Sequence, residues 1–559
     1  MKIEILDTTL RDGAQGVGVE FSPDDRRRVI LALDRLGVSY IEAGMIASEQ
    51  DAAFFESLRD LELECAKLAV FTRTARVGTD PRDDELLRLA AAAPVPAAVI
   101  YGKAQLYQVT EVLGATAEEN LRLIRESIRM LRDAGKEVIF DAEHFFAGWA
   151  DSPAYAMRTV DEAFEAGASR VVLCDTNGGM LPDVVGMVTE AVAKRHPGRG
   201  IGIHCHNDLG MAEAATVSAV LSGACHVQGT VGGVGERCGN ADLDTLIPVL
   251  QLKLGFDCAG SRISRLTETA RAVSDAANRT FDESAPFVGG YAFTHKAGAH
   301  IDGVRKDPAS FEHIDPAAVG NARSTVVSGL SGRAALLDRI RALLPETDSP
   351  SDPGAEGGSG PLSKDDPRVI RAAAAIRERE AAGFDYEEAS ASLTLALEEA
   401  LGLREHFFEL LSLKVLVDET SGEGDPAVPE ADTERFSASA VIKIRVGDRE
   451  YLTAGEGNGP VNAIDGALRR ALLRFYPELE SVRLTDYRVR VLDSKATASA
   501  VRVAISSTDG RRVWRTVGVS SDIINASWQA LRDSVEYVLA NSRKKTKDSA
   551  FQNQQGRSR

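Results

Sequence analysis

Short apolar runs alternate with longer amphipathic stretches through roughly the first 230 residues of the 559-residue chain. Several amphipathic stretches end at a glycine, a common residue at helix ends. Eight strand–helix units predict an α/β fold, a closed (β/α)8 TIM barrel, whose strand ends converge on one mouth. An open doubly wound sheet is the alternative, but it would separate the first and last strands. The predicted strands are Ile3–Leu6, Ser39–Glu42, Leu68–Phe71, Ala97–Ile100, Glu137–Phe140, Arg170–Cys174, Gly202–His204 and His226–Gly229.

Two histidines end the seventh predicted strand, in the segment IGIHCHND. His204 and His206 are two residues apart, so alternation along the strand points both imidazoles to one face. Such a pair is a weak indication by itself, and Asp12 and Asn240 are also typical capping residues. Because all four lie at or just after barrel strands, we predict that Asp12, His204, His206 and Asn240 form a mixed nitrogen and oxygen site for a divalent cation.

Further charged residues lie beside this predicted site. Arg11 precedes Asp12 and is either a structural ion-pair partner or a residue that holds an anionic substrate. A cation with open positions next to a guanidinium can bind a 2-oxo acid and stabilise the oxyanion that forms on it. Glu143 and His144 follow the fifth strand. A role in catalysis and ordinary packing at the barrel rim are equally good explanations for polar residues at this position. From the residues alone, His300 is a solvent-exposed histidine outside the barrel.

The sequence beyond the barrel divides into segments of different composition. We expect the barrel over residues 1–258, a helical subdomain over 259–344, a flexible Pro-, Gly- and Ser-rich linker over 345–365, an α+β domain over 366–540 and a disordered polar tail over 541–559. The chain is long enough for each of the larger segments to bury its own core.

The α+β domain contains a diverged internal repeat, and two such halves can bind a ligand between them or pair with a second subunit. In the first half, the loop GEGNGP opens a predicted helix, where backbone N–H groups can bind a carboxylate, although an ordinary glycine turn is the alternative. The predicted ligand-binding, regulatory residues are Gly455, Gly457, Asn458 and Gly459. The repeated residues are Gly455, Asn462, Ala463, Ala467, Leu468 and Arg469, which recur as Gly518, Asn525, Ala526, Ala530, Leu531 and Arg532.

Composition limits the partners and the compartment. A net charge of −18 argues against binding to nucleic acid or to an anionic membrane. The six cysteines are scattered and include no CxxC pair, which argues against disulfides and structural zinc and favours a reducing cytoplasm. The chain opens with strand sequence rather than a leader, and no apolar run approaches membrane-spanning length. We therefore expect a cytoplasmic protein that acts on small molecules.

Three segments, DTTLRDGAQ, IHCHNDLGMA and QGTVGGVGERCGNADL, resemble the signatures of the DRE-type TIM-barrel metalloenzymes. That superfamily includes the 2-isopropylmalate, homocitrate and citramalate synthases, 3-hydroxy-3-methylglutaryl-CoA lyase and the pyruvate carboxyltransferase domains. Within it, VIFDAEHFFAGW, VLCDTNGGMLPD, FTHKAGAHIDGV, AGEGNGPVNAIDGALRRAL and NASWQALRDSVEY resemble the long citramalate synthase branch. The resemblance runs from residue 3 to about residue 540 and is broken mainly at the expected linker.

The resemblance implies roles for most of the candidate residues. Asp12, His204 and His206 would be metal ligands, and Asn240 would be a further ligand or a close neighbour of the metal. Mg²⁺ or Mn²⁺ suits the oxygen donors, and the two imidazoles would also accept Zn²⁺. By the same resemblance, Arg11 would neutralise the keto oxygen and Thr176 would bind the carboxylate of the 2-oxo acid. Glu143 would lie in the catalytic pocket. His300 would enter the barrel of a partner subunit in a homodimer.

The implied reaction is a metal-assisted Claisen condensation of acetyl-CoA with a short 2-oxo acid, followed by thioester hydrolysis. Pyruvate would give (R)-citramalate and CoA, with feedback by isoleucine on the distal domain. Two loops at the mouth, AGMIAS (Ala43–Ser48) and GKAQLYQVTEV (Gly102–Val112), depart from the branch. A related alkylmalate synthase that uses another 2-oxo acid is therefore the first alternative, and a lyase related to 3-hydroxy-3-methylglutaryl-CoA lyase is the second.

Overall fold

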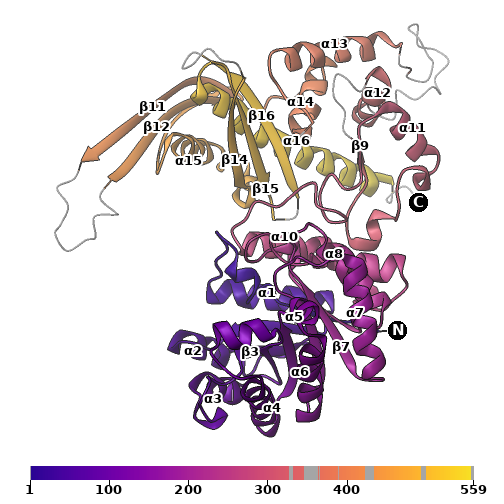
Figure 1. Cartoon of the computed structure of the whole chain (residues 1–559). Helices are drawn as coiled ribbons and strands as arrows, with labels where there is room; N and C mark the ends of the chain where they lie inside the picture. Colours follow the sequence, from indigo (N-terminus) through magenta and orange to yellow (C-terminus); the bar gives the residue numbers. More distant parts are fainter. Residues whose placement is uncertain are drawn as a thin grey trace. The chain divides into compact units, whose positions relative to one another are not determined.

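In the computed structural model, the chain folds into two compact units (Figure 1). The first comprises Met1–Thr294 and Asp307–Ser324, and the second His295–Lys306 and Thr325–Arg559. The stretch 259–344, which the sequence predicts to be one helical subdomain, therefore contributes to both units. The described residues are 2–325, 332–344, 363, 365–387, 389–421, 434–492, 499–510 and 512–555, so most of the expected linker at 345–365 lies outside them.

The first unit is a closed barrel of eight strands in sequence order, all of them parallel, which confirms the predicted (β/α)8 fold. The circle closes where β1 pairs with β8, with Ile5 opposite Val227. Every predicted strand is present within a few residues of its expected bounds. The strands are β1 (Glu4–Asp7), β2 (Tyr40–Met45), β3 (Lys67–Arg73), β4 (Ala97–Lys103), β5 (Glu137–Glu143), β6 (Arg170–Asp175), β7 (Gly200–Cys205) and β8 (His226–Gly229).

Helices surround the barrel because their apolar faces pack on the outward-facing strand residues in one continuous core. Local signals set their ends: Ser22 and Asp25 form a capping box at the start of α1, and Gly37 ends it with a left-handed φ of 93°. The helices are α1 (Pro23–Leu36), α2 (Glu49–Ser57), α3 (Glu85–Ala92), α4 (Ala117–Asp133), α5 (Phe145–Asp151), α6 (Pro153–Ala166), α7 (Pro182–Arg195), α8 (Ala212–Leu221), α9 (Leu243–Pro248) and α10 (Leu266–Ala276).

In the second unit, each half of the sequence repeat forms a three-stranded antiparallel sheet followed by a helix that packs on it, which confirms the α+β domain and its internal repeat. The repeated glycines allow this packing: a Cβ at Gly455 would lie 2.5 Å from the backbone nitrogen of Ala467, and one at Gly518 would lie 2.1 Å from the carbonyl oxygen of Ala526. The first half consists of β11 (Glu409–Ser421), β12 (Glu434–Val446), β13 (Arg449–Gly457) and α15 (Pro460–Leu472), and the second of β14 (Arg483–Val491), β15 (Val501–Thr508), β16 (Val513–Ser520) and α16 (Ile523–Gln555).

Within the described residues, four further α-helices belong to the second unit and share a core that includes Ile301, Ile376, Leu393 and Val517. The final helix, α16, continues to Gln555 and so occupies most of the range 541–559 that the sequence predicts to be a disordered tail. No proline or glycine occurs in this helix to end it earlier. The remaining elements are α11 (Gly298–Lys306), α12 (Gly332–Leu343), α13 (Pro367–Ala381), α14 (Ser390–Ala400) and the short strands β9 (Thr294–His295) and β10 (Ser324–Thr325). No helix in the described ranges is both long and apolar enough to cross a membrane.

A charged network lies at the start of the barrel strands, away from their carboxyl ends. Glu4 on β1 accepts two hydrogen bonds of 2.7 Å from Arg170 on β6, and Nδ1 of the fully buried His226 lies 3.5 Å from Glu4. Burial by itself raises the pKa of Glu4, but His226 and Arg170 outweigh it and hold the pKa at about 2. Ionised Glu4 therefore ties the first strand to two later ones.

We predict that Glu4→Gln lowers the free energy of unfolding at pH 7 by about 2 kcal/mol, because Arg170 loses its charged partner. Since folding lowers the pKa of Glu4 from 4.5 to about 2, the stabilisation is present above pH 4.5 and is lost as the pH falls through about 2. Urea unfolding across this pH range measures the difference between the two proteins. The exposed Glu62→Gln serves as the matched control, and an equal loss in both variants would contradict the assignment.

Candidate metal and substrate site at the barrel mouth

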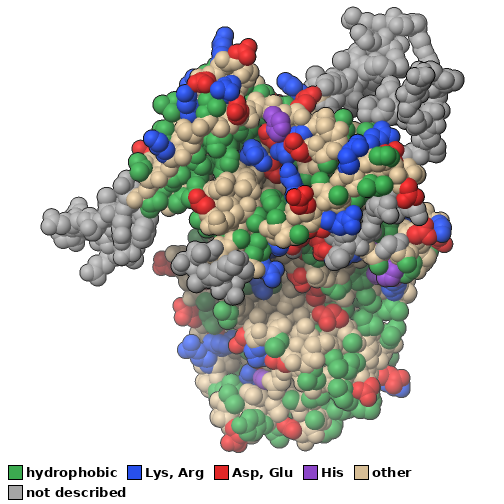
Figure 2. All heavy atoms as spheres, turned by 90° about the horizontal axis from the view of Figure 1, so that it is seen from above, with side chains coloured by type: hydrophobic (Ala, Val, Ile, Leu, Met, Phe, Trp, Pro, Cys, Tyr) green, Lys and Arg blue, Asp and Glu red, His purple; other side chains and the backbone are tan. Residues whose placement is uncertain are grey.

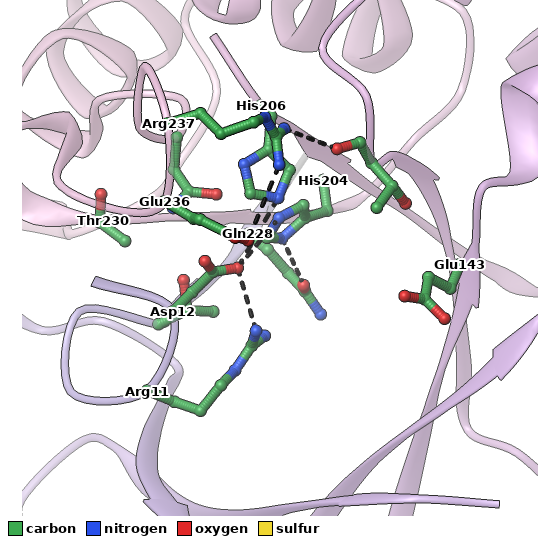
Figure 3. Close-up of polar contacts among 12 residues, drawn as sticks. Arg11, Asp12, Glu143, His204, His206, Gln228, Thr230, Glu236 and Arg237 are labelled. Carbon is green, nitrogen blue, oxygen red and sulfur yellow. Dashed lines mark hydrogen bonds and ion pairs between the residues drawn. The ribbon is translucent and has the colours of Figure 1, made fainter. Parts of the chain in front are cut away.

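Three predicted ligands meet at the carboxyl ends of β1 and β7 (Figure 3). Asp12 Oδ2 lies 3.4 Å from His204 Nε2 and 4.0 Å from His206 Nε2. One donor atom from each residue lies within 4.8 Å of the other two, and all three residues are buried. The predicted cluster of Asp12, His204 and His206 is therefore present, and its spacing is short enough for one ion to reach all three donors.

The electrostatics of these residues suit a cation. Burial by itself raises the pKa of Asp12, but Arg11 and the two histidines outweigh it and lower the pKa to about 2. Burial also lowers the pKa of His204 to about 4 and lowers that of His206. At neutral pH the carboxyl group is therefore ionised and both imidazoles are neutral, which is the protonation state that metal ligands require.

His204 is oriented by a hydrogen-bond chain behind it. Its Nδ1 lies 2.9 Å from Gln228 Oε1, and Gln228 Nε2 donates to Asp141 Oδ1 at 2.9 Å. Because the amide oxygen can only accept, Nδ1 carries the proton and Nε2 presents its lone pair toward Asp12. Asp141 and Gln228 thus set both the tautomer and the direction of the ligand nitrogen.

Asn240 lies next to the cluster, because its backbone pairs with that of His206 in an isolated β-bridge. Its Nδ2 donates to the carbonyl oxygen of Val234 at 3.1 Å, which fixes the orientation of the amide. Asp12 Oδ1 and Asn240 Oδ1 are buried without a hydrogen-bond partner among the described residues. Buried oxygens without partners are costly unless another group binds them, so these two atoms and the imidazole nitrogens fit a divalent cation.

Arg11 is held rigidly at the edge of the cluster. Its Nε donates to Glu42 Oε2 at 2.6 Å, its Nη1 donates to Asp12 Oδ2 at 3.0 Å, and the guanidinium lies 3.8 Å from the centre of the Phe71 ring. Glu42 is fully buried in the middle of β2. A positive charge that cannot reorient is therefore fixed beside the predicted metal, where it can stabilise negative charge on a substrate oxygen.

A pocket of about 280 Å³ opens above these groups. Met45, Phe71 and Tyr101, from the ends of β2, β3 and β4, line one side of it, and the Phe71 and Tyr101 rings stack at 5.3 Å. The metal cluster, Arg11, Glu143 and Thr176 also line the pocket. One small chamber thus combines charged groups of both signs with apolar residues.

Glu143 and Thr176 occupy the mouth as predicted. Glu143 ends β5, lies across the opening from Asp12 in Figure 3, and pairs with Lys103 Nζ at 2.5 Å. Thr176 Oγ1 accepts a hydrogen bond of 2.8 Å from the backbone nitrogen of His144, whose φ of 59° is left-handed. The loops after β5 and β6 are therefore locked together next to the pocket.

The other predicted site residues lie in the second unit. His300 is on α11 and is not among the residues that line the barrel pocket. Gly455 and Gly457 end β13, Asn458 follows them, and Gly459 caps α15. The structure thus groups Arg11, Asp12, Glu143, Thr176, His204, His206 and Asn240 at one mouth of the first unit, whereas His300 and the four loop residues belong to the second unit.

Several residues that line the pocket or contact the residues lining it were not predicted. Glu42, Asp141 and Gln228 are polar residues inside apolar strands, and strand alternation could have identified them as facing the barrel interior. No feature of the sequence around Lys103 indicated that it would contact a site residue. Arg237 lies in the glycine-rich loop after β8, where it donates to Asp208 at 2.9 Å and to the carbonyl oxygen of Thr176 at 2.8 Å. Only the tertiary structure places that loop against the end of β6.

Comparisons with known proteins cover nearly the whole chain. Residues 2–273 match the HMGL-like family, residues 287–349 the homocitrate synthase post-HMGL domain-like family and residues 387–539 the LeuA allosteric (dimerisation) domain. The (R)-citramalate synthase of Aquifex aeolicus is 41% identical over 96% of this chain and 98% of its own length. The (R)-citramalate synthases of Geobacter sulfurreducens (97% of this chain, 98% of its own) and Synechocystis sp. (96% and 96%) are each 40% identical.

We predict that Asp12→Asn lowers the affinity for Mn²⁺ by more than about 100-fold, because it removes a charged ligand. Gln228→Leu should lower the affinity by about 10- to 100-fold, because His204 is then no longer held in its orientation. Calorimetric titration of the metal-free protein with Mn²⁺ measures both effects. Asp60→Asn, at an exposed position, is the control. Unchanged Mn²⁺ affinity in Asp12→Asn would rule out this site.

Proposed function

The chain belongs to the (R)-citramalate synthase family, and from this premise we propose that it is an acyltransferase that condenses acetyl-CoA with pyruvate to give (R)-citramalate and CoA. Identity of about 40% over nearly the full length of both proteins carries this proposal. The grouping of the predicted site residues at one barrel mouth supports it independently.

In the proposed reaction the 2-oxo acid binds in the pocket between the cation site and the apolar wall. A divalent cation, with Mg²⁺ or Mn²⁺ suiting the oxygen donors and Zn²⁺ the alternative, would be held by Asp12, His204, His206 and Asn240 and would act as a Lewis acid toward the keto group. Arg11 supplies a fixed positive charge where the keto oxygen becomes an alkoxide. Its contacts with Glu42 and Phe71 hold it in place before the reaction begins, so no reorganisation is needed.

Thr176 and Glu143 take the remaining roles in the pocket. Thr176 lies beside it and would donate its hydroxyl hydrogen to the carboxylate of the 2-oxo acid. Glu143 faces the opening and would accept a proton from the methyl group of acetyl-CoA, with Lys103 orienting its carboxylate. His300 would complete this base from the partner subunit of a homodimer, as the resemblance to the citramalate synthases implies.

The shape of the pocket supports a small substrate. Its volume of about 280 Å³ must also accommodate the acetyl group, and the ring stack of Phe71 and Tyr101 with Met45 leaves little room for a branched side chain. Met45 belongs to the AGMIAS loop, which differs from the usual branch sequence. Pyruvate is therefore the proposed substrate, and a slightly larger 2-oxo acid is the alternative.

The second unit would mediate dimerisation and respond to an end-product amino acid, with isoleucine as the proposed effector. Its match to the LeuA allosteric (dimerisation) domain supports both roles. Leu416 and Leu452 are 62% and 69% exposed on the first sheet, and Figure 2 shows hydrophobic side chains at the surface of this unit. A separate pocket of about 630 Å³ lies beside α15 and is lined in part by the repeat residues Asn462 and Arg469, next to the predicted GEGNGP loop.

We predict that, with Mn²⁺ and acetyl-CoA, free CoA thiol is released fastest with pyruvate and more slowly with 2-oxobutyrate and 2-oxoisovalerate. Met45→Ala shortens a side chain of the apolar wall and so enlarges the pocket. The ratio of kcat/KM for 2-oxobutyrate to kcat/KM for pyruvate should rise by about 10-fold or more. Met187→Ala, an exposed methionine on α7, should leave the ratio unchanged. No CoA release with any 2-oxo acid would refute the synthase function.

A shared active site makes a second prediction. Glu143→Gln and His300→Ala should each abolish turnover, yet mixing the two variants and allowing their subunits to exchange should restore activity. Random exchange makes half of the dimers mixed, and each mixed dimer has one intact site of two, so about a quarter of wild-type activity returns. If His300 acts within its own subunit, the mixture stays inactive.

A further inference from the structure

The peptide between Lys103 and Ala104, at the carboxyl end of β4, is held from both sides. Lys103 and Glu143 are the last paired residues of β4 and β5. The backbone N–H of Ala104 donates to the carbonyl oxygen of Glu143 at 2.9 Å, and the carbonyl oxygen of Lys103 accepts from Asn120 Nδ2 at 2.8 Å. A side chain therefore supplies a hydrogen bond to the backbone at the point where the strand ladder ends.

Asn120 is fully buried on α4, and its contacts fix the orientation of its amide. Because the carbonyl oxygen of Lys103 can only accept a hydrogen bond, the amide nitrogen must face it. The same nitrogen donates at 2.9 Å to the hydroxyl of Tyr155 on α6, a helix that packs against α4. Both hydrogens of the amide are therefore used, one on the end of β4 and one on α6.

The position is a costly one for a polar side chain. Asn120 Oδ1 is buried and has no hydrogen-bond partner among the described residues. An apolar side chain of similar size would avoid that cost, but it would leave the carbonyl oxygen of Lys103 without this donor. The stability of α4 alone therefore does not explain an asparagine here, whereas its bond to the end of β4 does.

The side chain of Lys103 continues from this peptide to the barrel mouth. Its Nζ lies 2.5 Å from Glu143 Oε2, and both side chains are largely buried. Glu143 lines the barrel pocket and lies across the opening from Asp12 (Figure 3). Rotation of the Lys103 peptide would move the ammonium group and, with it, the carboxylate that it holds.

We propose that Asn120 is a positioning residue for the base of the reaction. It holds the Lys103 peptide so that the ammonium group directs the Glu143 carboxylate into the pocket. The inference rests on the proposed function of Glu143, which is to accept a proton from acetyl-CoA. Asn120 is not among the residues that line the pocket, so it acts through Lys103. Such support matters because a small misplacement of a reacting group slows the chemical step strongly.

The kinetic test compares the wild type, Asn120→Leu, Lys103→Met and the double variant. With Mn²⁺, acetyl-CoA and pyruvate, Asn120→Leu should lower kcat by about tenfold or more and leave the KM for pyruvate unchanged. In the Lys103→Met protein, adding Asn120→Leu should cause little further loss, because the group that it positions is gone.

Ser127→Ala is the matched control for this comparison. Ser127 is also fully buried on α4, and its Oγ accepts a hydrogen bond of 3.1 Å from the backbone nitrogen of Ala75, after β3. The variant therefore loses a comparable buried hydrogen bond from the same helix without touching the end of β4. It should keep kcat close to that of the wild type.

A second measurement does not depend on turnover. Acetic anhydride acetylates lysine side chains, and mass spectrometry follows the label on Lys103 in the folded protein. Asn120→Leu should raise the labelling rate of Lys103 by about fivefold, because its ion pair with Glu143 is loosened, and Ser127→Ala should not. Tyr155→Phe removes only the hydroxyl that holds the amide. It should change kcat and labelling in the same direction by less, and it tests the contact if Asn120→Leu does not fold.

Three results would overturn the proposal. They are unchanged Lys103 labelling or unchanged kcat in the Asn120 and Tyr155 variants, equal losses in Ser127→Ala, and a full additional loss in the double variant. If the wild type releases no CoA with any 2-oxo acid, the synthase function fails. The labelling rate of Lys103 then still decides whether Asn120 holds it in place.

Discussion

The functional arrangement of the first unit depends on the hydrogen bonds that join β1 to β8 and close the barrel. Ile5 and Val227 pair in register, and Thr8 Oγ1 donates to the carbonyl oxygen of Gly229, a residue 221 positions later. Closure brings Asp12, at one end of the strand order, to the histidines that end β7. An open sheet built from the same strands would leave the carboxylate and the imidazoles on different edges.

Three buried carboxyl groups, those of Asp12, Glu42 and Asp141, surround Arg11 at the mouth of the closed barrel. Asp12 is ionised, whereas burial raises the pKa of Glu42 to about 7 and that of Asp141 to about 8. A divalent cation would supply the missing positive charge, which agrees with the buried oxygens of Asp12 and Asn240 that have no partner among the described residues. The same shortage explains why Arg11 is so tightly held by its acidic neighbours.

The second unit follows a different principle, in which one sheet-and-helix pattern is used twice. Gly455 and Gly518 serve the same purpose in both halves, since each lets a helix approach its sheet closely. The halves then diverge on their open faces: the first sheet exposes Leu416 and Leu452, whereas the second exposes Arg488 and Arg490. Duplication thus preserved the core and left the outer faces to acquire separate properties.

Local patterns in the sequence determined the eight strands, the repeat and the residues that follow each strand, because hydrophobic periodicity and turn residues act over short distances. Asp12, His204, His206 and Asn240 could be predicted because the barrel topology alone places strand ends together. Gln228 behind His204, and Lys103 beside Glu143, depend instead on which residue of one strand faces which residue of another. Strand register and packing between distant segments decide those contacts, so only the tertiary structure shows them.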